Sequence, residues 1–181
     1  MAHIELPAGL PGISGPLSQY PETAEPLCLL AERLLRGPSS LTSAEREMIA
    51  TFVSSRNECQ FCMNSHGAAA RSLLGDDCAI VDAVVADYES ADIDDKLKAL
   101  LTIAGKVQQG GRRVTADDIT RARAAGADDK AIHDTVLIAA AFCMYNRYVD
   151  GLDTLIPDES IYAQMGDMLA TQGYVRKRPA E

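Results

Sequence analysis

Apolar residues recur at helical spacing along almost the whole sequence. Segment 94–109 is a clear case, because its apolar residues all fall on one face of a helix. These residues are Leu97, Leu100, Leu101, Ala104 and Val107. No two segments show the period-two alternation and tight turn of a β-hairpin. The sequence therefore predicts an all-α fold, and its 181 residues suit a single-domain helical bundle.

Capping residues and glycines indicate where these helices begin and end. Thr42-x-x-Glu45 and Thr115-x-x-Asp118 have the capping-box pattern, and Gly75 follows another periodic segment. The expected helices cover about 27–34, 43–55, 57–74, 76–87, 94–109, 115–125, 128–150 and a last segment from 158. An irregular arm, 1–20, is expected before the helical domain, 21–172, and a tail, 173–181, after it.

The composition excludes several classes of function. The chain has 26 acidic and 17 basic residues, a formal net charge of −9, which disfavours nucleic acid or an anionic membrane as partner. The longest apolar run, 136–145, is about half of a membrane span. The N-terminus lacks the basic start and apolar run of a secretory signal. A cytoplasmic protein is therefore expected, in which the five cysteines are reduced thiols.

The stretch NECQFCMNSH, residues 57–66, carries the most chemistry. At about 100° per helical residue, Cys59, Cys62 and His66 share one face, and Cys62 lies one turn from His66. Asn57 is a good N-cap residue, which would place both cysteines in the first turns, where the helix dipole lowers a thiol pKa. A disulfide at this spacing closes under strain and is therefore easily reduced. The pattern favours a dithiol redox pair.

Two other interpretations of the same residues stay open. The cysteines can be inert core thiols, since free cysteine is often buried. Alternatively, Cys59, Cys62 and His66 would supply three zinc ligands. The fourth would come from Cys78, Cys143, His133 or Glu47. A structural zinc site normally draws a second Cys/His pair from elsewhere, and none is visible, so the redox interpretation is preferred.

Other polar residues are ambiguous from the sequence. Glu47 points away from the apolar stripe of its helix, beside the small residues Ala50 and Ser54. It is either a solvated glutamate or one enclosed by a helix that approaches closely over those small residues. Asn146 and Asp150 lie one turn apart after the long apolar run, and we expect them to make structural contacts between helices or subunits.

The stretch LTSAEREMIATFVSSRNECQFCMNSHGAAAR, residues 41–71, resembles the alkylhydroperoxidase D-like proteins of the carboxymuconolactone decarboxylase superfamily, particularly their peroxidase-related branch. That family's pattern is a Glu followed about a dozen residues later by Cys-x-x-Cys-x-x-x-His. The matching residues here are Glu47, Cys59, Cys62 and His66. The segment RAAGADDKAIHDTVLIAAAFCMYNRYVDGL extends the resemblance over nearly the whole chain.

The resemblance implies an all-helical homo-oligomer, a trimer or hexamer, that reduces hydroperoxides through a thiol–disulfide cycle without metal, haem or other cofactor. Glu47 and His66 would relay protons to the cysteines. We expect Cys62 to attack and Cys59 to resolve the sulfenic acid, although the helix-end argument alone favours Cys59 as nucleophile. An external dithiol or disulfide reductase would restore the pair. Well-characterised members have a second His between the cysteines, where this chain has Phe61.

Two alternative functions are compatible with the same fold. One is decarboxylation of the carboxymuconolactone type, which needs a base and an oxyanion site but no dithiol. The other is a non-enzymatic oligomer whose disulfide senses the redox state. The first predicts activity that survives loss of both cysteines. The second predicts a redox-dependent mass with negligible turnover.

Overall fold

A computed structural model describes residues 2–175, and the fold is all-α as the sequence predicts. No strand occurs in that part of the chain. The helices are α1 Ser14–Gln19, α2 Pro21–Leu35, α3 Ser43–Arg56, α4 Gln60–Leu74, α5 Ala79–Asp87, α6 Asp95–Gln109, α7 Ala116–Ala124, α8 Asp129–Gly151 and α9 Glu159–Gln172. Short 3-10 helices cover Gly75–Asp77 and Gly111–Arg113. Positions 176–181 of the expected tail lie outside the described residues.

The capping boxes predicted for α3 and α7 form. Thr42 and Glu45 make the full capping box of α3, and Thr115 and Asp118 make that of α7. Asp128 accepts a hydrogen bond from the Ala131 N–H at the start of α8. These side chains satisfy backbone donors that would otherwise lack a partner, which fixes where each helix begins.

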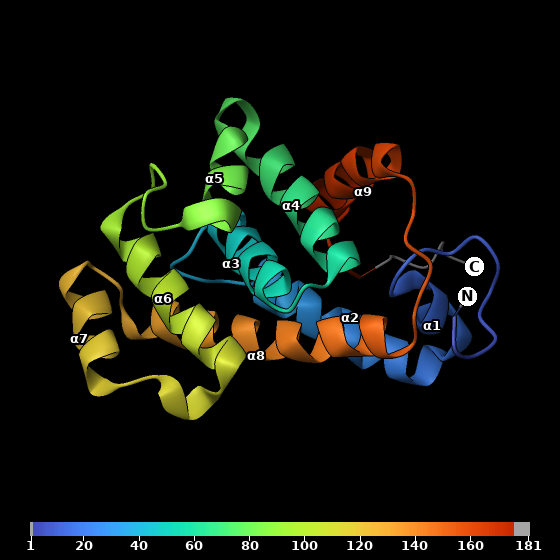
Figure 1. Cartoon of the computed structure of the whole chain (residues 1–181), viewed down its shortest axis with the longest axis horizontal. Coiled ribbons are helices and arrows are strands. Elements are labelled where there is room, and N and C mark those ends of the chain that lie inside the picture. The colour runs from blue at the N-terminus through green and yellow to red at the C-terminus, as the bar shows by residue number, and fades with distance from the viewer. Residues whose placement is uncertain (1, 176–181) are drawn as a thin grey trace.

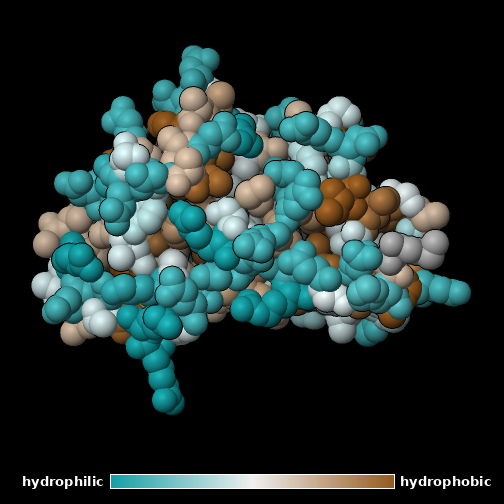
Figure 2. All heavy atoms as spheres, viewed as in Figure 1, coloured by the Kyte–Doolittle hydropathy of each residue, from teal (hydrophilic) through white to brown (hydrophobic). Residues whose placement is uncertain are grey.

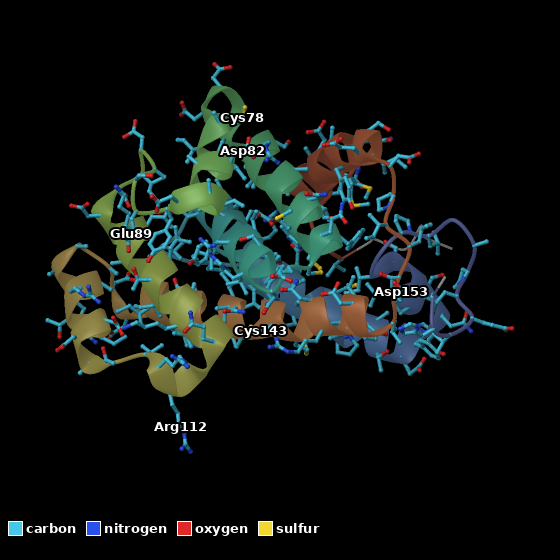
Figure 3. The ribbon with its side chains drawn as sticks, in the orientation of Figure 1. Cys78, Asp82, Glu89, Arg112, Cys143 and Asp153 are labelled. Carbon is cyan, nitrogen blue, oxygen red and sulfur yellow. The ribbon has the colours of Figure 1, made fainter. Side chains whose placement is uncertain are left out.

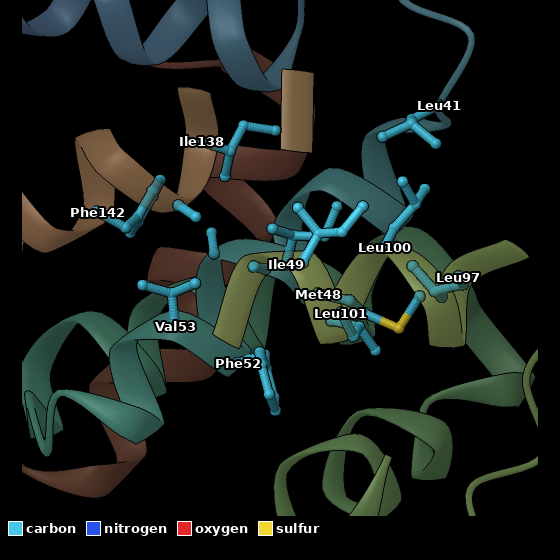
Figure 4. Close-up of a cluster of buried hydrophobic side chains, with 14 of the residues drawn as sticks. Leu41, Met48, Ile49, Phe52, Val53, Leu97, Leu100, Leu101, Ile138 and Phe142 are labelled. Atoms are coloured by element: carbon cyan, nitrogen blue, oxygen red, sulfur yellow. The ribbon is translucent and has the colours of Figure 1, made fainter. Parts of the chain in front are cut away.

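Helix α3 lies at the centre of the fold. It packs against α4, α6 and α8, while α8 runs along the length of the molecule and α9 packs on α4 (Figure 1). Apolar side chains from α3, α6 and α8 meet in one buried cluster (Figure 4). The labelled members include Ile49, Phe52, Leu101, Ile138 and Phe142, each no more than 2% exposed. This packing fixes the position of α3, which contributes to the site described below.

The start of α4 differs from the prediction. Asn57 is the C-cap of α3 and does not cap α4; Cys59 takes the N-cap position, with extended backbone and no capping side-chain bond. Glu58 between them has a positive φ of 60°, which turns the chain sharply from α3 into α4. Asn is a common N-cap residue, whereas a glutamate with positive φ is rare, so no sequence pattern predicts this turn.

The N-terminal segment packs on the body of the molecule. It contains the short helix α1. The Gly12 N–H donates a 2.7 Å hydrogen bond to the carbonyl oxygen of Leu155, in the connection between α8 and α9. Gly12 has φ of 51°, and a Cβ there would lie 2.2 Å from the Phe61 ring. The arm therefore covers the start of α4 closely, and only glycine fits at this position.

Within residues 2–175, no helix is long and apolar enough to cross a membrane. The face in Figure 2 is mostly hydrophilic, with a hydrophobic patch near α9. Leu155 and Ile156, in the connection leading to α9, are 51% and 49% exposed.

Candidate active site

The two motif cysteines lie in a small buried cluster, separate from the main core. Cys59 and Cys62 are 0% and 3% exposed and pack with Phe61, Val149 and Tyr162. These residues come from α4, α8 and α9, so the thiols are enclosed where three helices meet. Both cysteines are free thiols.

The surroundings distinguish the two thiols. A hydrogen bond from Cys59 lowers the pKa of Cys62, and the positive charge of His66 and a bond from Asn146 lower it further against the effect of burial. The bond to Cys62 and burial raise the pKa of Cys59, and the nearby Asp150 carboxylate acts in the same direction. Cys62 is therefore the thiol stabilised as an anion, with Cys59 as its protonated donor.

Asn146 connects this cluster to α3. Its amide nitrogen donates to Ser54 Oγ at 3.0 Å, and its oxygen accepts from Asn57 Nδ2 at 2.8 Å. Asn57 in turn accepts from Gln108 Nε2 at 2.9 Å. Since Asn146 is only 1% exposed, this network fixes its orientation beside Cys62.

Glu47 is completely buried on α3 and is the centre of a second polar network. Its Oε2 lies 2.8 Å from His66 Nδ1, and its Oε1 lies 2.6 Å from Arg36 Nη2. Tyr174 donates its hydroxyl to the same Oε1 at 2.5 Å. Of the two possibilities for Glu47, a solvated or an enclosed side chain, the structure shows the enclosed one. Its carboxylate contacts His66, Arg36 and Tyr174.

Charge compensation keeps Glu47 ionised despite its burial. Burial alone would raise the pKa of this carboxyl, but the charge and hydrogen bond of His66, the charge of Arg36 and the Tyr174 hydroxyl together lower it. Burial, and then the Glu47 charge, raise the pKa of Tyr174 well above its usual range, so the phenol stays protonated as a donor.

Aromatic rings hold His66 in place. The Tyr174 ring stacks on the imidazole, with centroids 5.8 Å apart and an interplanar angle of 12°. Phe142 meets the imidazole edge-on at 4.5 Å. The Arg36 guanidinium covers the Tyr174 ring at 5.2 Å from its centroid. Glu47 therefore fixes which ring nitrogen of His66 faces the carboxylate, and the aromatic neighbours fix the plane of the imidazole ring.

The structure brings together all four residues of the motif, in two linked networks. Glu47 contacts His66 directly, Cys59 contacts Cys62, and the charge of His66 acts on Cys62. The arrangement can hold a thiolate, a second thiol within reach of it and a fixed imidazole–carboxylate pair.

Several residues of this site carried no clear signal in the sequence. Arg36 is the C-cap residue of α2, Tyr162 lies on α9 and Tyr174 follows α9, and only tertiary packing places them here.

Asn146 makes the expected structural contacts between helices, to Ser54 and Asn57, and in addition Asn146 and Asp150 both act on the thiols. The one available signal was their i, i+4 spacing on a helix with an otherwise apolar run.

Cys78 and Cys143 lie outside the dithiol cluster. Figure 3 shows Cys78 beside α5, at the opposite side of the molecule from Cys143 on α8. The amide of Asn57 lies 3.6 Å from Cys143 Sγ. Among the residues described, no group of three or more His, Cys, Asp or Glu side chains is placed to hold a metal ion.

Comparisons with known proteins concern the family and the fold. The carboxymuconolactone decarboxylase family model matches residues 21–87, which include the whole motif. An uncharacterized peroxidase-related protein from Silicibacter sp. TM1040 is 30% identical, with a TM-score of 0.75 over 83% of this chain and 80% of that chain. No curated protein gives a significant match.

Two further solved structures are similar. An alkylhydroperoxidase AhpD core protein from Ralstonia eutropha JMP134, also described as uncharacterized and peroxidase-related, is 29% identical with a TM-score of 0.77 over 87% of this chain and 81% of that chain. A protein of unknown function from Agrobacterium tumefaciens shares the fold at 21% identity, with a TM-score of 0.66 over 78% of this chain and 95% of that chain. On this evidence the chain belongs to the carboxymuconolactone decarboxylase superfamily, among its alkylhydroperoxidase-like, peroxidase-related members.

Proposed function

We propose that the protein is a thiol-dependent peroxidase that reduces alkyl hydroperoxides through a dithiol–disulfide cycle of Cys59 and Cys62. The observation that carries the proposal is the unequal surroundings of the two thiols. Cys59, His66 and Asn146 lower the pKa of Cys62, whereas burial and the bond to Cys62 raise that of Cys59. The part of this difference that does not come from the pair itself is the position of His66 and Asn146 beside Cys62 and of Asp150 beside Cys59.

The cycle has three steps. The Cys62 thiolate attacks the terminal oxygen of the hydroperoxide; the O–O bond breaks, and Cys62 sulfenic acid and an alkoxide form. The alkoxide takes a proton and leaves as an alcohol. The Cys59 thiol then displaces the sulfenic oxygen as water, forming the disulfide. An external dithiol or a disulfide reductase supplies two electrons and two protons to restore the thiols.

His66 and Glu47 have a defined part in this scheme. Protonated His66 stabilises the Cys62 thiolate by charge, while the Glu47 carboxylate holds the imidazole through the 2.8 Å contact at Nδ1. No external cofactor is required, because the electrons come from the thiol reductant. The proposed setting is the cytosol, where thiol reductants are abundant.

The test is hydroperoxide consumption by metal-free protein with a dithiol reductant. Wild type should turn over, Cys62→Ser should not, and Cys59→Ser should turn over only as fast as the external dithiol reduces the Cys62 sulfenic acid directly. Cys78→Ser is the matched control, since Cys78 lies outside the dithiol cluster, and it should keep wild-type turnover. Wild type without turnover, or Cys62→Ser with full turnover, would contradict the proposal.

We also propose that the protein works as a homo-oligomer. The exposed apolar side chains near α9, Leu155 and Ile156, support this, because a second copy covering them would remove apolar surface from water. Light scattering coupled to size exclusion tests it, with Leu155→Glu as the variant expected to reduce the mass. A monomeric wild type would contradict the proposal.

A further inference from the structure

Tyr162 on α9 places a phenol beside the dithiol. The residue is 5% exposed and belongs to the same buried cluster as Cys59 and Cys62. Its other neighbours there, Phe61 and Val149, are apolar; the Phe61 ring lies 6.3 Å from the Tyr162 ring between centroids. Tyr162 therefore brings a hydroxyl from α9 to the side of the dithiol, in addition to the Asn146 and Asp150 side chains of α8.

The Tyr162 hydroxyl has no hydrogen-bond partner among the described residues. The Asn64 side chain lies near it, but the pair does not meet hydrogen-bond geometry. A buried hydroxyl without a partner lowers the free energy of unfolding, so a phenylalanine here would fold at least as well. A buried unsatisfied group next to reactive atoms points to a ligand that bonds it.

Close packing of α9 on α4 fixes the position of this hydroxyl. At Gly166 an added Cβ would lie 2.5 Å from the Ala68 carbonyl carbon, so the helices meet backbone to backbone. Ser65 Oγ lies 3.3 Å from Met165 Sδ on the same interface. Tyr162 cannot turn its hydroxyl toward solvent without shifting α9.

The phenol is a donor at neutral pH. Burial raises the pKa of Tyr162; the Asn64 side chain opposes this shift, and negative charge on Cys62 and Cys59 adds smaller increases. A protonated phenol beside a thiolate can donate to an oxygen that gains negative charge. An alkoxide is far more basic than a phenolate, so proton transfer in that direction is favourable.

We propose that the Tyr162 hydroxyl donates a hydrogen bond to the hydroperoxide oxygen that leaves as alkoxide when Cys62 attacks. This inference rests on the proposed peroxidase function. As the O–O bond breaks, negative charge grows on the leaving oxygen, and the fixed phenol stabilises it. The proton that completes the alcohol comes from the phenol and is returned to it from solvent. Tyr162 is thus a catalytic residue for the peroxide step alone.

The experiment compares two reactions of Cys62 in wild type and Tyr162→Phe. One is single-turnover oxidation by an alkyl hydroperoxide; the other is alkylation by iodoacetamide, whose leaving iodide needs no proton. We expect Tyr162→Phe to slow oxidation about a hundredfold, leave alkylation unchanged, and keep or raise the melting temperature.

Tyr145→Phe is the matched control. Tyr145 is also 5% exposed, but its hydroxyl donates to Leu27 O at 2.8 Å, and it belongs to the main core and not to the cluster of Cys59 and Cys62. This control should lower the melting temperature and keep both rates.

Equal oxidation rates for Tyr162→Phe and wild type would overturn the inference while the peroxidase proposal stands. Parallel loss of both rates would also overturn it, because Tyr162 would then act through Cys62 itself. A wild type that is alkylated but not oxidised would refute the peroxidase function and this inference with it.

Discussion

The Tyr174 hydroxyl donates a 2.5 Å hydrogen bond to Oε1 of Glu47, across 127 positions of sequence. The same ring stacks on His66, so one residue contacts both members of the imidazole–carboxylate pair. The segment after α9 therefore closes the network that α3 and α4 begin. The stability of this network and the reactivity of the dithiol can be tested separately.

Tyr174→Phe keeps the ring and its stacking but removes the donor to Glu47. Because hydrogen bonds to a charged group are strong, we expect the free energy of unfolding to fall by about 2 kcal/mol, measured by urea denaturation at pH 7. Tyr20→Phe, at an exposed tyrosine, should change it by less than about 0.5 kcal/mol. Equal stability of Tyr174→Phe and wild type would show that water replaces the bond.

Glu47→Gln removes the buried charge that pairs with Arg36 and His66. We expect a loss of about 3 kcal/mol at neutral pH, because two cationic partners then lack their anion. The pKa of Glu47 is lowered in the folded state, so its contribution is complete above the ordinary glutamate range and is lost on acidification through the lowered value. Denaturation at a series of pH values should therefore show the two proteins converging below about pH 4. A gap that widens on acidification would contradict this assignment.

The two thiols should differ in reactivity. At pH 7, with limiting iodoacetamide and peptide mapping by mass spectrometry, we expect Cys62 to be labelled before Cys59, since its pKa is lowered and that of Cys59 is raised. Asn146→Ala should shift the pH profile of Cys62 labelling upward, because the thiolate loses a donor. Preferential labelling of Cys59 would reverse the assigned roles.

Gly166→Ala should separate α9 from α4. The added methyl would overlap the Ala68 backbone, and we expect a cost of about 1–3 kcal/mol together with faster alkylation of the uncovered dithiol. Gly151→Ala is the control, because nothing lies within 4 Å of its Cβ; on a helix it should stabilise by about 0.5–1 kcal/mol. Unchanged alkylation in Gly166→Ala would mean that α9 does not limit access to the cysteines.

The sequence predicted the helices well because their signals are local. The stripe of α6 and the capping boxes of α3 and α7 each involve residues within a few turns of each other. The turn at Glu58 was not predicted, because its positive φ results from the packing of α3 on α4 and glutamate is not a residue type that favours positive φ.

For the site, the motif residues were identifiable but their partners were not. Glu47, Cys59, Cys62 and His66 form a recognisable spacing. Arg36 reaches Glu47 from another helix, and its interaction depends only on how the helices pack. No periodicity or local spacing encodes such long-range contacts.

The residues of α9 that cover the dithiol come much later in the sequence than the two cysteines, so the thiols are synthesised before they can be buried. Tyr162, which packs on both thiols, follows Cys62 by 100 positions, so at about 5–20 residues per second the ribosome releases the cysteine segment roughly 5–20 s before this partner. During that interval the two thiols are unshielded and free to pair with thiols of other chains. A protein built in this order depends on a reducing environment at the ribosome, whatever the finished molecule tolerates.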